Sequence, residues 1–359
     1  MKVIWKLAVA TCLPVLAACA TVQAPAPTPV PSAPQVSPPR EGAAAPAVSQ
    51  VGVTPPAAPL PEAFESEDFI VTFAKPGDTS QSLAARFLGD PAKAWLLEDY
   101  SGVQSPVAGR EVVIPKRPWN PAGVTRAGQQ VVPVLVYHNI APQAKGRMVV
   151  SARAFEDQMR FLKAQGFHVL AVRDFAQFIS LNRQLPRKSV VLTFDDGYKS
   201  FLQYAYPVLK ELGFPATLFV YTDYVGSGRS ALTWSELKQL ADEGFEIGAH
   251  SKSHENLRRR PGETDAVFLR RMQAELSQAP FQKNLGMAPR VLAFPYGAAD
   301  AEVLAKVRDQ GYVVAFTVRR EGNPSFAPPL VLGRSQVYGD MSLDTFAKNL
   351  ETFAPETLN

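Results

Sequence analysis

Residues 131–359 of the sequence predict an α/β fold with parallel strands, and two observations lead to this prediction. Short apolar runs, several of them rich in β-branched residues, alternate with stretches whose apolar residues recur every three or four positions. The first pattern is typical of buried strands and the second of helices that cover a sheet. Because such an alternation joins each strand to the next through a crossover helix, we expect the strands to run parallel.

Each element is located by its own pattern. The expected strands are 132–137, 190–194, 217–221, 246–249, 291–294 and 313–318. The expected helices are 153–165, 174–181, 200–212, 234–243, 301–310 and 343–353. A chain of 359 residues, of which 46% are hydrophobic, is long enough to bury the core that such a domain needs.

Two carboxylates follow the expected strand at 190–194, where the apolar run stops at Asp195, Asp196 and Gly197. The carboxyl ends of parallel strands are where ligands and catalytic groups collect in α/β proteins. Neighbouring residues on a strand point to opposite faces, so the two carboxylates converge only if the backbone turns, which Gly197 permits. Taken alone, an Asp-Asp-Gly is also typical of a polar turn that caps a helix.

Two histidines follow the expected strand at 246–249. His250 and His254 stand four positions apart, separated by Ser-Lys-Ser. Imidazole binds Zn, Fe and Ni, and two imidazoles with one carboxylate leave positions open for water and substrate. Together with the carboxylates, the pattern predicts a hydrolytic metal site. Without the carboxylates, a solvated loop would be the better interpretation of these histidines.

The two motifs together resemble the NodB-homology polysaccharide deacetylases, whose first motif reads T-F-D-D-G and whose second reads H-[ST]-x-x-H. Both are present residue for residue, at 193–197 and 250–254. The resemblance spans 131–353, and further phrases similar to the family are V-L-V-Y-H at 134–138, T-W-S-E-L at 233–237, G-F-E-I-G at 244–248 and F-P-Y-G at 294–297. It implies a distorted, incomplete (β/α) barrel of the NodB type.

The resemblance also implies roles for the four polar residues. Asp196, His250 and His254 would hold a divalent metal, most simply Zn²⁺, which makes water a nucleophile at neutral pH. Asp195 would be the base that takes the proton of the attacking water.

The F-P-Y-G phrase at 294–297 is the third motif, and it is expected to supply a hydrogen-bond donor to the oxyanion. In the family this donor is the N–H of the residue after the proline, here Tyr296. One such donor typically raises the rate by about 10² to 10³. The alternative is a purely structural turn with a packed Tyr296 ring. Family members often carry an arginine that orients the base two positions before the proline, where this chain has Ala293. Arg290 or Arg334 would have to substitute, and Arg334 is favoured because it follows an apolar run; a surface role for it is the alternative.

The residue that would act as the general acid also departs from the family pattern. Many members supply a histidine late in the domain, but this sequence has none after His254. His138 ends the expected strand at 132–137 instead, as in a permuted branch similar to poly-N-acetylglucosamine deacetylases. Imidazole titrates in the range that protonation of a leaving amine needs. A packed or capping role is the alternative for His138, and His168, far from any motif, is expected to be structural.

Residues 1–18 have the features of a lipoprotein signal peptide. Lys2 and Lys6 precede an apolar run, and L-A-A-C at 16–19 resembles a bacterial lipobox. Cleavage before Cys19 and acylation of its thiol would leave an exported protein, anchored to a membrane in the cell envelope or periplasm, and to the outer membrane in a Gram-negative cell. An ordinary secretory signal or a short transmembrane helix is the alternative.

Three segments lie between Cys19 and the α/β domain. Residues 19–67 are rich in proline and alanine and are expected to form a linker, and 118–130 a second one. Between them, 68–117 shows a βααβ order in which Phe69, Val71 and Phe73 alternate as a strand. K-P-G-D-T at 75–79 and V-V-I-P at 112–115 resemble a LysM domain, a family that binds glycans containing N-acetylglucosamine; a structural lead-in to the barrel is the alternative.

These features predict a metal-dependent hydrolase that removes N-acetyl groups from an envelope polysaccharide containing N-acetylglucosamine, either peptidoglycan or a poly-N-acetylglucosamine exopolysaccharide. An O-acetyl polysaccharide esterase and a non-catalytic glycan-binding lipoprotein are the alternatives. The formal charge of +4 falls to +2 once Lys2 and Lys6 leave with the signal, which gives no reason to expect nucleic-acid binding.

Overall fold

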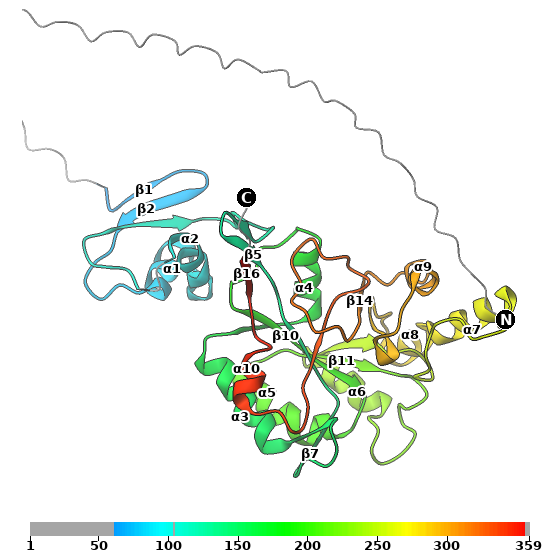
Figure 1. The fold of residues 1–359 in the computed structure, drawn as a ribbon. Coiled ribbons are helices and arrows are strands. Elements are labelled where there is room, and N and C mark those ends of the chain that lie inside the picture. The colour runs from blue at the N-terminus through cyan, green and yellow to red at the C-terminus, as the bar shows by residue number, and fades with distance from the viewer. Residues whose placement is uncertain (1–60, 103–104, 356–359) are drawn as a thin grey trace, which may run out of the picture. The chain divides into compact units, whose positions relative to one another are not determined.

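The computed structural model describes residues 61–102 and 105–355 (Figure 1). The expected signal peptide, Cys19 and the larger part of the proline-rich stretch lie outside the described residues. Within them, no helix is both long and apolar enough to cross a bilayer.

The first folded part is a three-stranded antiparallel sheet covered by two helices. Its strands are β1 (Ala63–Glu65), β2 (Phe69–Phe73) and β3 (Glu111–Pro115), with β2 in the middle. Helices α1 (Ser80–Leu88) and α2 (Ala94–Ser101), joined by a 3₁₀ turn at Pro91–Lys93, connect β2 to β3. The expected βααβ order is therefore present, and β1 adds a strand inside 19–67, the range expected to be a linker.

A side-chain cap sets the start of the first helix in this module. The buried face of its central strand is not the one that the phenylalanines would suggest. The Thr79 hydroxyl accepts a hydrogen bond from the Ser82 N–H at 3.0 Å, which caps α1. In β2, the side chain of Ile70 is buried and that of Phe73 is half exposed, so the face opposite to the phenylalanines packs on the helices. Phe69 instead packs against the Tyr100 ring, 5.3 Å away between centroids.

The second part is built on a parallel sheet with the strand order β14-β13-β12-β11-β10-β6-β15, and β9 also pairs with β10. The bounds are β6 (Val134–Tyr137), β9 (His168–Leu170), β10 (Ser189–Asp196), β11 (Thr217–Val220), β12 (Glu246–Ala249), β13 (Val291–Ala293), β14 (Val314–Phe316) and β15 (Ser335–Gln336). The main helices are α3 (Ala152–Ala164), α4 (Val172–Ile179), α5 (Tyr206–Leu212), α6 (Trp234–Asp242), α7 (Asp265–Glu275), α8 (Ala279–Leu285), α9 (Ala301–Asp309) and α10 (Leu343–Ala347). All six expected strands are present as neighbours in one curled parallel sheet, as the expected incomplete barrel requires.

Some elements have no clear sequence pattern or differ from the expected one. The short strands β9 and β15 and the helices α7 and α8 were not expected. Strands β4 (Val124–Thr125) and β5 (Gly128–Gln130) fall in 118–130, the second expected linker, because β5 pairs with the distant β16 (Phe353–Pro355). Two further short strands, β7 (Asn139–Ala141) and β8 (Val149–Ser151), pair in parallel.

The expected helix at 200–212 is divided. It begins as a π-helical turn, Phe201–Ala205, and continues as α5. Pro207 has no N–H to donate to the preceding turn, which favours this change in hydrogen-bond pattern near the start of α5.

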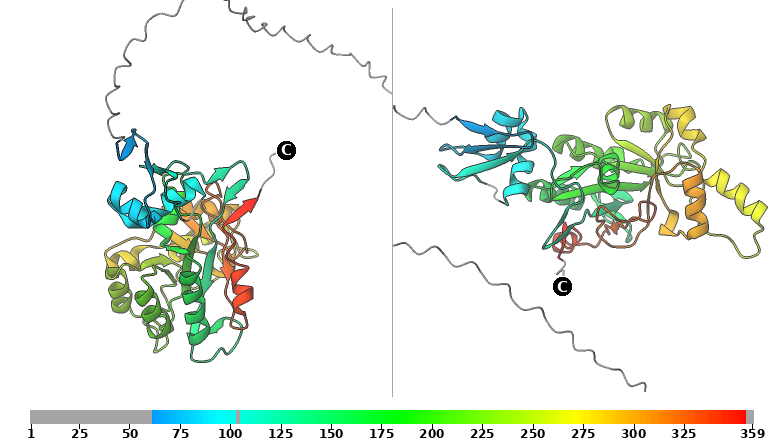
Figure 2. Two further views of the ribbon diagram at one scale, coloured as in Figure 1. Left: turned by 90° about the vertical axis from the view of Figure 1, so that its left-hand side faces the viewer. Right: turned by 90° about the horizontal axis from the view of Figure 1, so that it is seen from above.

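The two faces of the main sheet pack against different partners. Alternate residues of β10, such as Leu192 and Phe194, join one apolar cluster that also contains residues of α3, α5, α6, α7 and α9. Figure 2 shows the helices of this part around its sheet in two further views. Val191, one position away, joins a second cluster that includes Phe219, Phe316 and residues of α4. Because side chains alternate along a strand, Asp195 belongs to the Val191 face, and the burial of that face sets its surroundings.

Candidate metal centre

Three predicted ligands come together at the carboxyl end of the sheet. One ligand atom each from Asp196, His250 and His254 lies within 4.8 Å of the others. The Asp196 Oδ1 is 3.6 Å from the His250 Nε2 and 3.3 Å from the His254 Nε2. An arrangement of two imidazoles and one carboxylate at these separations can surround a single divalent cation.

The backbone at the end of β10 turns as the convergence of the carboxylates requires. Asp196 has φ = 76° and Gly197 has φ = 88°, both in the left-handed region. Such a φ is unfavourable for a residue with a side chain, by roughly 1–2 kcal/mol, and it is typical of functional sites. The turn brings the Asp196 carboxylate to the same end of the sheet as Asp195, although the two residues are neighbours on a strand.

His250 is fixed at the end of β12 by two hydrogen bonds. Its N–H donates to the Val220 carbonyl at 2.9 Å. Its Nδ1 lies 2.7 Å from the Ala293 carbonyl oxygen, which can only accept, so Nδ1 carries the proton. The Nε2 lone pair therefore faces Asp196 and is available to a metal, the tautomer that a carbonyl partner usually imposes on ligating histidines.

A glutamate that the sequence analysis did not single out holds the turn between the two histidines. Glu275 of α7 accepts from the Lys252 N–H at 3.1 Å, the Ser253 N–H at 3.0 Å and the Ser253 hydroxyl at 2.7 Å. His254 itself has φ = 60°. The carboxylate is buried and its backbone partners lie inside the H-S-K-S-H motif, so it fixes the conformation that presents His254.

The electrostatics of these residues fit a cation. The Asp196 Oδ1 is buried and has no hydrogen-bond partner among the described residues. Burial, followed by the charge of Asp195, raises the pKa of Asp196 to about 6, and burial lowers the pKa of His250 to about 4. Lone pairs of a carboxylate and a neutral imidazole thus face each other with no proton donor between them, and a divalent cation would satisfy both.

Asp195 is held by an arginine from a distant part of the chain. The Nη1 and Nη2 of Arg334 donate to its two carboxylate oxygens at 2.7 Å each, and the Arg334 Nε donates to the Thr317 carbonyl at 3.1 Å. Arg334 is fully buried. Burial alone would raise the pKa of Asp195, but the charge of Arg334 and its hydrogen bonds outweigh burial and lower the pKa to about 2. Arg290, the other candidate, lies at the opposite end of β13, where its carbonyl accepts from Val313.

His138 lies next to the two carboxylates. Tyr137 is paired with Phe194 across β6 and β10. The next residue along each chain segment, His138 or Asp195, therefore lies beside the other. The charge of His138 lowers the pKa of both Asp195 and Asp196. Its Nδ1 is buried without a hydrogen-bond partner among the described residues, so this nitrogen is available to a bound group.

Tyr296 occupies a tight turn beside the histidines. The Gly297 N–H donates to the Phe294 carbonyl at 2.8 Å, and the Ala298 N–H donates to the Pro295 carbonyl at 3.1 Å. These turn bonds do not use the Tyr296 N–H, and its residue has φ = 60°. The Tyr296 ring lies 4.9 Å from the His254 ring, and the residue is 67% exposed.

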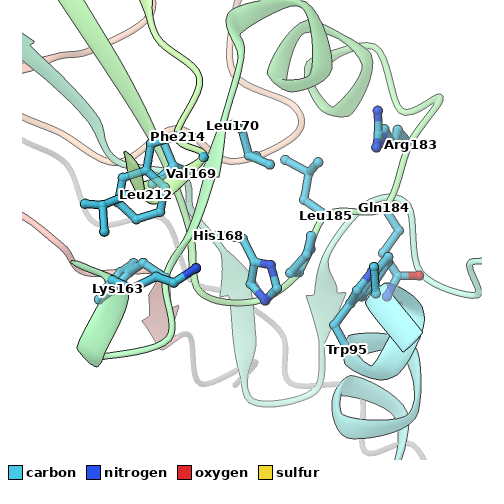
Figure 3. Close-up of a pocket in the computed structure, with 14 residues that line it drawn as sticks. Trp95, Lys163, His168, Val169, Leu170, Arg183, Gln184, Leu185, Leu212 and Phe214 are labelled. Atoms are coloured by element: carbon cyan, nitrogen blue, oxygen red, sulfur yellow. The ribbon is translucent and has the colours of Figure 1, made fainter. Parts of the chain in front are cut away.

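A separate cavity of about 340 Å³ lies away from these residues (Figure 3). Trp95 of α2, His168 of β9 and Lys163 of α3 are among its lining residues. His168 pairs with Ser189, at the opposite end of β10 from Asp195. Neither the carboxylates nor the other three histidines described above line this cavity, so it is distinct from the candidate metal centre.

Comparison with known proteins points to one family. Residues 182–315 match the family model described as polysaccharide deacetylase. The *Bacillus subtilis* (strain 168) protein YxkH is 26% identical over 223 residues, which cover 62% of this chain and 76% of that protein. A poly-beta-1,6-N-acetyl-D-glucosamine N-deacetylase of *Staphylococcus aureus* (strain MRSA252) is 25% identical over 182 residues, which cover 48% of this chain and 62% of the enzyme, less than two thirds of its length.

Solved structures share the fold. IcaB from *Ammonifex degensii* superposes with a TM-score of 0.55 at 27% identity, covering 63% of this chain and 99% of that one. The *Streptococcus pyogenes* deacetylase PplD, solved with acetate, gives a TM-score of 0.56 at 23% identity and covers 62% of this chain and 98% of that one. The similarity to PplD concerns the fold alone.

Proposed function

We propose that this chain is a polysaccharide deacetylase that removes N-acetyl groups from a polymer of N-acetylglucosamine with the help of a divalent cation, most simply Zn²⁺. The name of the staphylococcal relatives supports this substrate class. Of the two polymers considered from the sequence, those names favour poly-N-acetylglucosamine over peptidoglycan.

One observation carries the proposal: the buried ion pair of Asp195 and Arg334 lies beside the three converging ligand atoms. The Asp195 Oδ2 is 3.8 Å from the His250 Nε2, so an ionised carboxylate borders the metal centre without being one of its three ligands. Two neighbouring aspartates thus have different environments. Asp196 faces the imidazoles, as a metal ligand must. Asp195 is kept ionised by the Arg334 guanidinium, as a base must be.

The residues have the following roles in this proposal. A cation held by Asp196, His250 and His254 would polarise the acetyl carbonyl and lower the pKa of water. Asp195 accepts the proton of the water whose oxygen attacks the acetyl carbon, and Arg334 keeps Asp195 ionised and oriented. The Tyr296 N–H donates to the oxyanion that forms. The carbon–nitrogen bond then breaks as His138 donates a proton to the leaving amine, giving acetate and a free amine on the sugar.

The N-terminal segments would place this chemistry at the cell envelope. The proposed lipid on Cys19 would anchor the exported protein to a membrane of the cell envelope, which would be the outer membrane in a Gram-negative cell. The module from β1 to β3 has the βααβ order of the LysM resemblance, and we include glycan binding by this module in the proposal.

Acetate release by the purified protein with Zn²⁺ tests the proposal, with poly-N-acetylglucosamine and peptidoglycan as separate substrates. We expect acetate from poly-N-acetylglucosamine, and its loss in Asp195→Asn and His250→Ala. His168→Ala serves as a control, because His168 lies at the far end of β10. Acetate from an O-acetylated polysaccharide alone would favour an esterase, and sugar binding without any acetate release would favour a binding lipoprotein.

A further inference from the structure

Tyr296 combines two unfavourable features beside the metal centre. Its backbone lies in the left-handed region at φ = 60°, which is strained for a bulky residue. Its ring is 67% exposed, so an aromatic surface faces water instead of the core. Presentation of the N–H to an oxyanion explains the strain but does not explain an exposed ring. A bound molecule that covers the ring would account for the second feature.

The Tyr296 ring continues a row of aromatic rings that surrounds His254. On another side of His254, the Tyr221 ring lies 5.2 Å away. Tyr224 stacks on Tyr221 at 5.1 Å with an interplanar angle of 18°, and Tyr198 meets Tyr224 edge-on at 5.6 Å. The Tyr198 side chain is in turn near enough to Asp196 to lower the pKa of that carboxyl group. The row thus runs from the third motif, past one metal ligand, to another.

Backbone hydrogen bonds hold this row in place. The Thr222 N–H donates to the Ser251 carbonyl at 3.2 Å, and the Asp223 N–H donates to the Lys252 carbonyl at 2.9 Å. The segment with Tyr221 and Tyr224 is therefore attached to the turn that carries the histidines. Rigid aromatic side chains bind a ligand with little loss of conformational entropy.

Charge identifies the kind of ligand. The charged side chains interleaved with the row, Asp223 and Lys252, pair with each other at 2.7 Å. Next to Tyr198, Lys199 pairs with Glu236 at 2.8 Å. A surface of phenol rings whose adjacent charges are paired suits a neutral ring with an apolar face and polar edges. A pyranose has this character, with C–H groups on its faces and hydroxyl groups around its rim.

We propose that the exposed ring of Tyr296 is a stacking platform for a neutral N-acetylhexosamine unit adjoining the unit that loses its acetyl group. The proposal rests on the proposed function, since it takes the substrate to be a polymer of such sugars. The platform binds the neighbouring unit in the ground state and in the transition state alike. It therefore lowers KM for oligosaccharides and has little influence on kcat.

Steady-state kinetics on β-1,6-linked N-acetylglucosamine oligomers of one to five units test the platform, with Zn²⁺ present. For Tyr296→Leu, which keeps the backbone N–H assigned to the oxyanion, we expect KM for the pentamer to rise about tenfold. Tyr296→Phe keeps the ring and should keep the KM of the unaltered protein. Phe326→Leu is the matched control, because Phe326 is also an exposed aromatic residue, at 59%, and lies outside the tyrosine row.

Binding separates this inference from the proposed function. The affinity of Asp195→Asn for the pentamer, measured calorimetrically, should fall about tenfold on adding Tyr296→Leu, whether or not the protein turns the sugar over. An unchanged affinity and KM in Tyr296→Leu would overturn the platform and leave the deacetylase proposal intact. A loss of kcat equal in Tyr296→Leu and Tyr296→Phe would also overturn it, since the hydroxyl rather than the ring would then matter.

Discussion

Arg334 and Asp195 lie 139 residues apart in the chain, yet they form a buried two-pronged ion pair with both contacts at 2.7 Å. The Arg334 guanidinium also lies over the rings of Phe219 and Phe316, at 5.5 and 5.8 Å from their centroids. The buried arginine therefore lies between the candidate base and these two rings.

Removing one partner of this pair should cost more than removing both. We expect Arg334→Met to destabilise folding by about 3–5 kcal/mol, because it leaves a buried carboxylate without a cation. Adding Asp195→Asn should restore a large share of that loss, since no buried charge then remains. Urea unfolding of the unaltered protein, the two single variants and the double variant gives a double-mutant cycle. Strictly additive losses of unfolding free energy would contradict a direct pair.

The conservative change tests the geometry separately from the charge. Arg334→Lys keeps a cation but has no planar fork, so Asp195 would be held by one contact instead of two. We expect kcat for acetate release to fall about 100-fold, while the far-ultraviolet circular dichroism is retained. Arg290→Lys, at the opposite end of β13, is the control and should leave kcat unchanged.

Glu275 should determine how tightly the site holds a cation. In Glu275→Ala the Lys252 and Ser253 N–H groups lose the carboxylate oxygen that accepts from both of them. We expect Zn²⁺ affinity, measured by competition with a chromophoric chelator, to fall about 10- to 100-fold. Ser253→Ala removes only the hydroxyl contact and should have a smaller effect. Equal affinities for all three proteins would show that Glu275 does not position the histidines.

Gly297 should tolerate no side chain. It has φ = 67°, and a Cβ atom there would lie 2.6 Å from the Val318 amide nitrogen. We expect Gly297→Ala to destabilise folding by about 2–4 kcal/mol, from the backbone conformation and the clash together. Gly286→Ala is matched in φ, at 73°, but opens onto free space, so it should cost only about 1 kcal/mol. Thermal or urea unfolding compares the two variants.

Asp99 in α2 should make stability depend on pH. Burial raises its pKa to about 6, although the charge of Arg187 opposes this shift. The folded protein then binds a proton that the unfolded chain releases between about pH 4 and 6, so the contribution of Asp99 to stability is lost as pH rises through this range. Asp99→Asn should stabilise the protein at pH 7.5, by up to about 3 kcal/mol, and not at pH 3.5. Urea unfolding at both pH values checks this, and an equal difference at the two would exclude titration of Asp99.

Much of the fold followed from local patterns. The six short apolar runs became adjacent strands of one sheet, and two helices join β2 to β3 as the βααβ order indicated. The convergence of Asp196, His250 and His254 also followed, because the motifs end parallel strands and such strands share one carboxyl edge. The spacing of apolar residues and the residue types at turns indicate each strand or helix from a few neighbouring positions.

Other features depended on partners far away in the chain. The strand β5 pairs with the distant β16 as well as with its neighbour β4, and the exposed face of β2 is set by the helices that cover the other face. Glu275 acts on the histidine turn from a helix that had no distinct sequence pattern. A side chain that binds distant backbone amides leaves no periodic signal near itself, so inspection of single motifs does not find it.

The sequence by itself determined the chemistry that is available: two adjacent carboxylates, two imidazoles four residues apart, and strands that deliver both pairs to one edge. The tertiary structure decided which aspartate faces the histidines and which is paired with a cation. That choice depends on the left-handed backbone at Asp196 and on the register of β15 beside β6, which brings Arg334 under Asp195. Both are set by packing across the whole sheet, because a single residue's conformational strain and a buried charge are stable only where many distant contacts fix them.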